Sequence, residues 1–498
     1  KIQRSYWNGF IIFISHHLLY SAIHNRRKWD MNMRIVMKFG GTSVANGEKI
    51  RHVATLLKGF HEKGDELIAV TSALGGITDG LLGTAKDVSK SGKVSQVKEF
   101  IADITKKHYD AIHAAIEDED IISETIEVID QRLDELEKAL IGICYLGELT
   151  PRSIDYISSY GERLAAPIVS GSIRSLGIGS KWLTGGEAGI ITDSNYGNAR
   201  PLEKSYELIK ERLSPLLNCS IVTVVTGFIA EDEAGIISTL GRSGSDFSAS
   251  ILGAAVKADE IWLWKEVHGI MTSDPRIVPE AKSLPQISYI EAMELSYFGA
   301  KVLHPRTIEP AIKHRIPVRV KNTFEPAFEG TLIVADQVPS QDVVKAVTLI
   351  KDVALVNICG AGMMGTIGTA ARVFTSLANV GVNIIMISQA SSEANMSLVV
   401  MEEQLETAVN AIRSEFNRNV VGDVVYDRDI CAVAVVGAGM DGTPGVAGRV
   451  FGILGKEKVN IIMISQGSSQ HNISFVVSSK DAINAVRALH REFTEGHQ

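Results

Sequence analysis

The stretch KFGGTSV, residues 38–44, decides how the first half of this chain folds. Before it stands MRIVM, residues 33–37, a short apolar run that predicts a buried strand. After it, the helical spacing of apolar residues begins at Gly47. A lysine therefore ends a strand, two glycines form a turn, and hydroxyl residues lead towards a helix. Such a turn presents backbone N–H groups and one cation to a phosphate group.

Two other interpretations of this stretch are possible in principle. A Walker A loop is excluded, because no Gly-Lys-Ser/Thr follows at the required spacing. An ordinary strand, turn and helix with a surface lysine explains the local pattern as well as a phosphate site does. Only agreement elsewhere in the chain separates the two.

The rhythm of strand, glycine turn and helix recurs along the chain. Residues 66–73 predict a second strand, which a glycine turn at 74–79 separates from another helical pattern. The β-branched run 221–229 predicts a central strand, and the glycine-rich turn that follows it encloses Arg242. This order indicates an α/β domain with a parallel sheet, whose active site gathers at the carboxyl ends of the strands.

Two helical stretches lie between these strands. Residues 93–143 are charged at many i,i+4 offsets and predict a solvated helical hairpin without chemistry. Thr150 and Pro151 predict the start of the next helix, with threonine as N-cap. That helix carries Glu162 and Arg163, which form either a surface pair or a buried carboxylate that needs a cationic partner.

Composition restricts the function. The chain has 498 residues, a net charge of −8 and a pI near 6.0, which argue for several domains and against a nucleic-acid partner. The four cysteines show no metal-ligand spacing, so we expect no side-chain metal cluster and a cytoplasmic location. The apolar segment 7–23 is either an anchor or, as preferred, part of a non-native leader before Met31 or Met33, so no membrane partner is expected.

The last third of the chain is a duplication. NIIMISQ at 383–389 recurs unchanged at 460–466, an offset of 77 residues, and each copy predicts strand, glycine turn, helix, two strands and helix. Each copy also contains Gly-x-Gly-x-x-Gly. A dinucleotide site is rejected, because Gln389 and Gln466 stand where an acidic residue is required.

Several motifs in a fixed order resemble the aspartate kinases of the amino-acid kinase family. They are residues 38–43, 160–163, 226–228, 241–246, 272–276 and 298–305. The repeats are similar to tandem ACT domains, and the whole is similar to single-function archaeal aspartate kinases, its length leaving no room for a fused dehydrogenase. The resemblance implies an α/β amino-acid kinase fold, a parallel-rich sheet sandwiched by helices, followed by two α+β ACT domains. The expected divisions are a leader of doubtful status at 1–32, a kinase domain at 33–325, a linker at 326–343, and ACT domains at 344–420 and 421–496.

The resemblance also implies an activity: phosphorylation of the L-aspartate side-chain carboxylate by ATP with Mg²⁺. Lys38, Asp246 and Lys301 are the implied catalytic residues. Glu162 would hold the α-ammonium of aspartate and Arg242 its α-carboxylate, as an amino-acid zwitterion requires. The pocket would be lined by Thr42, Ser72, Ala73, Thr78, Phe228 and Ser245. The nucleotide would meet Lys38, Gly40, Gly41, Lys265, Glu266, Met271, Arg276 and Lys301.

Four positions depart from the family pattern. Lys265 and Glu266 stand where threonine and aspartate are usual, and Met271 replaces a frequent aromatic residue. Ser243 occupies a position that is usually glycine, and it is strained if φ is positive there. No charge assigned to the chemistry is lost.

The repeat implies feedback regulation by an amino acid, threonine or lysine, and a homodimer or larger assembly through the ACT domains. The implied effector contacts are Met363, Gly365, Asn383, Ile385 and Gln389. Two alternatives stay open. One is a kinase of the same fold for another substrate, such as glutamate, N-acetylglutamate, carbamate or UMP. The other is a catalytically impaired amino-acid sensor.

Overall fold

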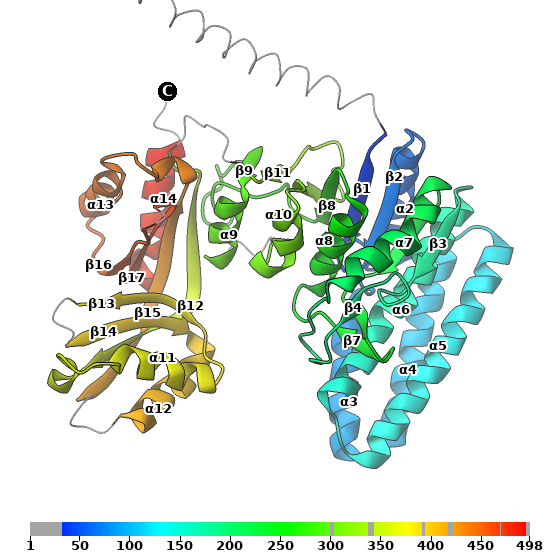
Figure 1. Ribbon diagram of the computed structural model, residues 1–498, viewed down its shortest axis with the longest axis horizontal. Helices are drawn as coiled ribbons and strands as arrows, with labels where there is room; N and C mark the ends of the chain where they lie inside the picture. Colours follow the sequence, from blue (N-terminus) through cyan, green and yellow to red (C-terminus); the bar gives the residue numbers. More distant parts are fainter. Residues whose placement is uncertain are drawn as a thin grey trace, which may run out of the picture. The chain divides into compact units, whose positions relative to one another are not determined.

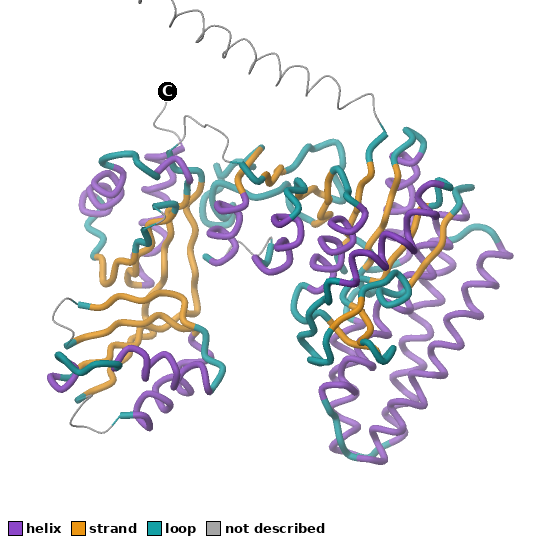
Figure 2. Tube along the Cα trace, viewed as in Figure 1, coloured by secondary structure: helices purple, strands orange, loops and turns teal. Residues whose placement is uncertain are grey.

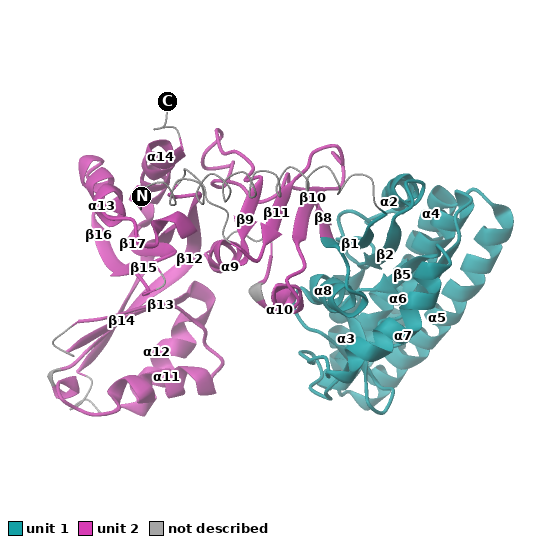
Figure 3. Ribbon diagram, turned by 45° about the horizontal axis from the view of Figure 1, so that its top comes forward, with its two compact units in different colours: residues 1–261 teal, residues 262–498 magenta. Residues whose placement is uncertain are grey.

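The computed structural model describes residues 32–298, 303–336, 343–390, 394–416, 422–468 and 470–494. It divides into two compact units, residues 1–261 and residues 262–498, which are coloured separately in Figure 3. The predicted leader lies outside the described residues, apart from its last residue.

The first unit is built on parallel strands. Their order is β3-β5-β2-β1, and each neighbouring pair is parallel (Figure 1). These strands are β1 Arg34–Phe39, β2 Glu66–Thr71, β3 Ser180–Leu183 and β5 Val222–Thr226. β1, β2 and β5 are almost wholly buried, as expected when helices cover a parallel sheet. The predicted α/β domain is thus confirmed.

The helices in the described part of this unit are coloured purple in Figure 2. They are α2 Gly47–His61, α3 Ile77–Ser91, α4 Val94–Ala115, α5 Glu119–Leu146, α6 Pro151–Ser175, α7 Lys204–Asn218 and α8 Gly244–Val256. A small second sheet contains β4 Ile191–Thr192, β6 Ile229–Asp232 and β7 Ile237–Thr239. The helical hairpin predicted at 93–143 corresponds to α4 and α5.

Helix α6 is largely buried. Thr150 is its N-cap and accepts a hydrogen bond from the Ser153 N–H, and Pro151 is its first residue, as the sequence predicts. Its residues from Ile157 to Ile173 are all buried. Glu162 and Arg163 therefore lie in the interior, not on the surface.

The second unit begins with a mixed sheet in the order β8-β10-β11-β9. Its elements are β8 Glu260–Lys265, which starts at the unit boundary, β9 Gln286–Ser288, α9 Tyr289–Tyr297, η1 Pro305–Ile308, α10 Glu309–Lys313, β10 Val318–Asn322 and β11 Thr331–Val334. The structure differs from the linker expected at 326–343, because β11 lies inside that range and pairs with β10 and β9. Strand β11 has only four residues, which is too short to give a recognisable alternation of apolar and polar residues.

The duplicated region forms one antiparallel sheet in the order β13-β14-β12-β15-β17-β16. Its strands are β12 Ala346–Cys359, β13 Ile384–Gln389, β14 Asn395–Met401, β15 Asp423–Val436, β16 Ile461–Ser465 and β17 Asn472–Ser478. The helices are η2 Ala361–Met363, α11 Thr369–Asn379, η3 Glu402–Gln404, α12 Leu405–Glu415, η4 Ala438–Met440, α13 Val446–Lys456 and α14 Ser479–Thr494. This element order confirms the duplication.

The two long strands β12 and β15 are shared between the copies. Residues 346–350 of β12 pair with 432–436 of β15, whereas residues 353–359 pair with 423–430. Two cores result: Val344 and Val347 pack with the second copy, and Ala354 and Val356 with the first. The expected boundary between residues 420 and 421 follows the sequence repeat. In the structure, however, the ends of β12 and β15 that belong to the second copy lie on either side of the first copy in the chain.

Candidate functional site

The buried lysine at the end of β1 pairs with an acid on α8. Lys38 is 8% exposed, and its Nζ lies 2.6 Å from Oδ1 of Asp246. Asp246 is in the first turn of α8, where the helix dipole also favours a negative charge. The ammonium group of Lys38 is therefore fixed in position at the carboxyl end of the sheet.

The glycine turn after β1 leaves backbone donors available. The carbonyl of Gly40 accepts hydrogen bonds from the N–H groups of Ser43 and Val44, at 2.9 and 3.2 Å. No protein acceptor is recorded for the N–H groups of Gly41 and Thr42 within the described residues. Two amides next to a fixed ammonium group can bind an anion such as phosphate.

The ends of the neighbouring strands bring further predicted residues to this place. The Ser72 N–H donates to the Phe39 carbonyl at 3.2 Å, so the ends of β1 and β2 stay adjacent. The hydroxyl of Ser72 lies 3.3 Å from that of Ser245, one residue before Asp246. Lys38, Ser72, Ser245 and Asp246 thus line one edge of the sheet.

Glu162 adds a buried carboxylate from α6. Glu162 is 5% exposed, and this burial raises its pKa to about 8. Three interactions lower the pKa but do not outweigh burial: hydrogen bonds from the N–H groups of Glu162 and Ala73, and the charge of Lys38. Its Oε2 atom has no hydrogen-bond partner in the described part of the chain. A buried acid with an unused acceptor is suited to bind a cationic group of a ligand.

A glycine lets α6 approach the loop after β2. A Cβ atom on Gly161 would lie 2.8 Å from the Cβ of Ala73 and 3.1 Å from Oγ1 of Thr78. Contacts that short do not occur between real side chains, so glycine is required. The close approach holds Glu162 beside Ala73, and it brings the predicted pocket residues Ala73 and Thr78 to the same wall.

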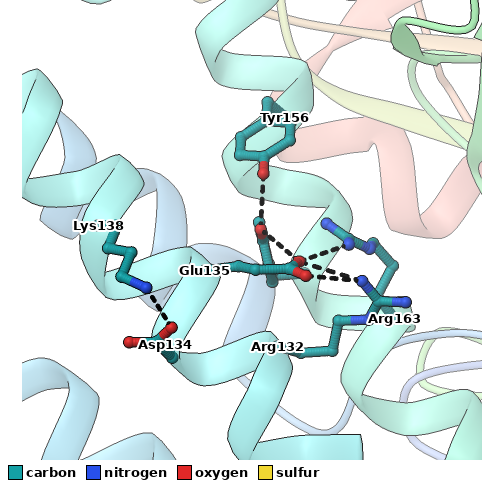
Figure 4. Close-up of polar contacts among 7 residues, drawn as sticks. Arg132, Asp134, Glu135, Lys138, Tyr156 and Arg163 are labelled. Carbon is teal, nitrogen blue, oxygen red and sulfur yellow. Dashed lines mark hydrogen bonds and ion pairs between the residues drawn. The ribbon is translucent and has the colours of Figure 1, made fainter.

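Arg163 is not the partner of Glu162. Its guanidinium turns to α5, where Nη2 lies 2.9 Å from Oε2 of Glu135 (Figure 4). Arg132 and the hydroxyl of Tyr160 bind the same carboxylate, at 3.0 and 3.2 Å. Burial alone would raise the pKa of Glu135, but the two arginines hold it below its usual value. The sequence gives no local signal for this network, because Glu135 and Arg163 stand on different helices.

The second glycine-rich turn joins β7 to α8. Arg242 is exposed there, and no ion pair is recorded for it in the ranges that the structure describes. A Cβ on Gly244 would lie 2.7 Å from the Phe228 ring, so turn and ring are in close contact. The turn therefore brings Phe228 next to the start of α8.

Ser243 in this turn is expected to carry backbone strain that glycine relieves. Its φ is 58° and its ψ 25°, the left-handed region, and its side chain makes no capping hydrogen bond. Ser243→Gly should stabilise the protein by about 0.5–1 kcal/mol, measured as a higher melting temperature. Ser123→Gly, inside α5, is the matched control and should be destabilising. A decrease in melting temperature for both variants would contradict this prediction.

The second unit contains the other residues that are predicted to contact the nucleotide. Lys265 ends β8 and is half-buried, Glu266 is exposed, and Met271 forms a bridge with Ser283. Arg276 is exposed and binds Asp274, with 2.7 Å between Nη2 and Oδ2. Lys301 lies outside the described residues. Their roles stay predictions.

The first ACT copy contains a pocket of about 290 Å³ at its glycine turn. It is lined by Met363, Gly365, Thr366, Ile367, Gly368, Thr369, Ala370, Gln389 and Met396. Three of the five predicted effector contacts are among them: Met363, Gly365 and Gln389. Asn383 and Ile385 are not, and the Asn383 N–H donates to Oε1 of Gln404 at 3.4 Å.

The described residues lack two kinds of feature. No group of three or more histidine, cysteine or acidic side chains is placed to hold a metal ion there. None of the helices in those ranges has the length and apolar character needed to cross a membrane.

Comparisons with known proteins agree with this architecture. Residues 33–322 match the amino acid kinase family, and residues 356–416 and 433–493 each match an ACT domain. Aspartokinase 1, chloroplastic, of Arabidopsis thaliana is 33% identical over 476 residues, covering 94% of this chain and 81% of that protein. Bifunctional aspartokinase/homoserine dehydrogenase 2, chloroplastic, of the same plant is 34% identical over 468 residues, covering 92% of this chain. The chain spans about half the length of that bifunctional relative.

Solved structures of E. coli aspartokinase III are also similar. The T-state complex with lysine and aspartate has a TM-score of 0.78 and 28% identity, covering 93% of this chain and 99% of that one. The R-state complex with aspartate and ADP has a TM-score of 0.74 and 28% identity, covering 92% and 99%. The archaeal resemblance stays a prediction. By its family match, its relatives and its tandem ACT copies, the chain belongs to the aspartokinases of the amino acid kinase family.

Proposed function

We propose that this chain catalyses the phosphorylation of the L-aspartate side-chain carboxylate by ATP, giving 4-phospho-L-aspartate. The observation that carries the proposal is the group of opposite charges at the strand ends: the ammonium of Lys38, fixed by Asp246, and the buried carboxylate of Glu162. An amino-acid substrate and a polyphosphate need both signs in one place. The R-state structure of the E. coli relative was solved with aspartate and ADP, which supports nucleotide use.

This reaction requires neutralisation of negative charge more than it requires a general base. The attacking carboxylate has an ordinary pKa of about 3.9 and is ionised at neutral pH. Its approach to the terminal phosphate of ATP brings two anions together. Lys38 and the N–H groups of Gly41 and Thr42 would offset that charge in a buried site, where electrostatic stabilisation is strong. The oxygen of the carboxylate bonds to phosphorus as the bond to ADP breaks.

The remaining site residues would orient the two substrates. Glu162 would accept the α-ammonium of aspartate, and Arg242, exposed in its turn, would bind the α-carboxylate. We propose that Mg²⁺ enters with ATP. The carboxylate of Asp246 could serve Lys38 or the metal ion, and its 2.6 Å contact with Lys38 favours the first role.

The test is an assay of acyl phosphate formation from L-aspartate, ATP and Mg²⁺, trapped as the hydroxamate. Glutamate, N-acetylglutamate and carbamate serve as alternative substrates. Turnover with another acid alone would keep the fold and refute the substrate. Absence of turnover with every acid, together with amino-acid binding, would favour a sensor. The presence of Lys38, Asp246 and Glu162 in their buried positions supports an enzyme.

We also propose that lysine or threonine inhibits by binding the pocket of the first ACT copy. The T-state structure of the E. coli relative was solved with lysine and aspartate, which supports an amino-acid effector. Gln389→Ala should raise the inhibitory concentration about tenfold or more, because a side-chain hydrogen bond to the effector would be lost. Gln466→Ala, at the equivalent place in the second copy, is the matched control and should leave inhibition unchanged. Equal effects of both changes would refute this site.

Assembly through the ACT sheet is a further part of the proposal. The two outer strands of the sheet carry exposed isoleucines. The exposed fraction is 42% for Ile387 on β13, and 40% and 44% for Ile462 and Ile464 on β16. Exposed apolar side chains on edge strands favour pairing with a second chain. Sedimentation equilibrium of the full chain tests this, since a monomeric mass would refute it.

A further inference from the structure

The glycine turns of the two ACT copies are built alike. In the first copy the Gly360 N–H donates to the Ala394 carbonyl at 3.0 Å, and in the second the Gly437 N–H donates to the His471 carbonyl at 3.1 Å. The equivalent glycines Gly365 and Gly442 both have a φ of 66°. Corresponding threonine hydroxyls bind the carbonyls of Gly362 and Gly439, each at 2.7 Å. The two turns therefore have similar backbone conformations, and they differ in their surroundings.

The difference lies in what occupies the turn. In the second copy the Ala438 N–H donates to Oε1 of Glu291 at 2.9 Å. Glu291 stands in the first turn of α9, which lies within the range that matches the amino acid kinase family, and it is wholly buried. The turn of the first copy borders the pocket of about 290 Å³ instead.

The second oxygen of Glu291 is bound as well. Oε2 lies 3.2 Å from Nζ of Lys345, and it accepts hydrogen bonds from the N–H and hydroxyl of Ser288 at 2.8 and 3.0 Å. Burial by itself raises the pKa of Glu291, but these donors outweigh burial and hold it below its usual value. The Glu291 carboxylate is thus buried and bound by protein donors on both oxygens, among them one amide of the turn and one ammonium.

A second acid of α9 reaches the same turn. Nδ2 of Asn472, at the start of β17, donates to Oε2 of Glu294 at 2.9 Å. The equivalent residue of the first copy is Asn395, which is exposed at the start of β14. Two independent contacts therefore bring the acidic side of α9 to the turn of the second copy.

We propose that the second ACT copy carries a built-in ligand: the carboxylate of Glu291 binds the glycine turn that corresponds to the turn beside the proposed effector pocket of the first copy. The proposal rests on the proposed function, in which the first copy binds an amino-acid effector. It extends that function, because it makes the second copy a permanently occupied site that fastens α9 to the regulatory sheet. One effector per chain is the expected stoichiometry.

The test is carboxylate rescue of Glu291→Ala. This variant leaves the Ala438 N–H and the Lys345 ammonium facing the space of the missing side chain. Sodium acetate or sodium propionate should raise its melting temperature by about 2 °C or more over sodium chloride at equal ionic strength. Wild-type protein and Glu294→Ala, which leaves Glu291 in place, should respond to the three salts alike.

Two results would overturn the proposal. If Glu291 only caps α9, Glu291→Ala melts lower but acetate and chloride act equally. Equilibrium dialysis of the wild-type chain with labelled lysine and threonine gives an independent test that needs no variant. At most one bound molecule per chain supports the proposal, and two refute it. The melting measurement needs neither turnover nor effector binding, so it separates this proposal from a failure of the proposed function.

Discussion

Replacing Lys38 by methionine is expected to lower kcat for ADP formation from L-aspartate and ATP by about 10³-fold or more. Methionine keeps the length and apolar stem of lysine but removes the ammonium group that lies 2.6 Å from Asp246. The transferring phosphoryl group then loses the cation that offsets its charge in a buried site. Steady-state kinetics with coupled detection of ADP measure the loss.

The matched control for this change is Lys49→Met. Lys49 donates from Nζ to the Thr42 carbonyl at 3.0 Å, so it touches the same turn from the outside. We expect kcat within about threefold of wild type, because a partly exposed hydrogen bond contributes little. If Lys38→Met keeps more than a tenth of wild-type kcat while both variants fold, Lys38 is not the phosphoryl-stabilising group.

The second large effect is expected at Glu162. Glu162→Gln should lower kcat/KM for aspartate by about 10²- to 10³-fold, since a buried charged hydrogen bond to the α-ammonium is lost. Glutamine preserves the shape of the side chain and the contact with the Ala73 N–H. KM for ATP should change much less, which separates a substrate contact from general damage to the site.

The pKa of Glu162 gives this residue a signature in calorimetry. With a pKa of about 8, the ligand-free carboxyl group is mostly protonated at pH 7. Binding of an ammonium group requires the ionised form, so aspartate binding should release up to about one proton per chain at pH 7. The apparent affinity should rise with pH up to about 8. The measurement compares binding enthalpies in buffers of different ionisation enthalpy, and equal proton release by wild type and Glu162→Gln would exclude this role.

The same pKa shift affects stability in a defined direction. Folding raises the pKa of Glu162 from 4.5 to about 8, so the folded state binds the proton more tightly than the unfolded state. The associated stability is fully present below pH 4.5 and is lost as the pH rises through 8. Without substrate, the melting temperature of the wild-type protein should fall more between pH 6.5 and pH 9 than that of Glu162→Gln. The extra loss corresponds to roughly 2 kcal/mol of unfolding free energy.

Local patterns in the sequence were sufficient for several elements of the candidate site. The apolar run before Lys38 and the glycines after it predict a strand end, and the structure has β1 ending at Phe39. The Thr-Pro signal predicts the start of α6, but it leaves open whether Glu162 lies on the surface or in the interior, where the structure has it. The family pattern predicts strain at Ser243 only if its φ is positive, and the structure has a φ of 58° there. Each of these inferences depends on neighbours within a few residues.

Contacts between distant segments could not be predicted in this way. Glu135 stands in a charged helix of ordinary appearance, and only the packing of α5 on α6 makes it the partner of Arg163. Glu291 is the N3 residue of a capping box with Ser288, and its contact with the Ala438 N–H joins residues that are 147 positions apart. The short strand β11 is stabilised by two neighbours in its sheet, not by its own sequence.

The shared strands β12 and β15 determine how the regulatory region is made during synthesis. The second copy needs residues 346–350, which leave the ribosome before the first copy, and residues 432–436, which leave after it. It cannot complete its sheet until the nested copy has been made. A cut at residue 420 would divide the strands of both copies between two fragments, so an isolated second copy requires residues 344–350 joined to 430–493 by a new connection. The gene segment for the first copy is therefore the natural unit of exchange between relatives, because it can be replaced without breaking the outer copy.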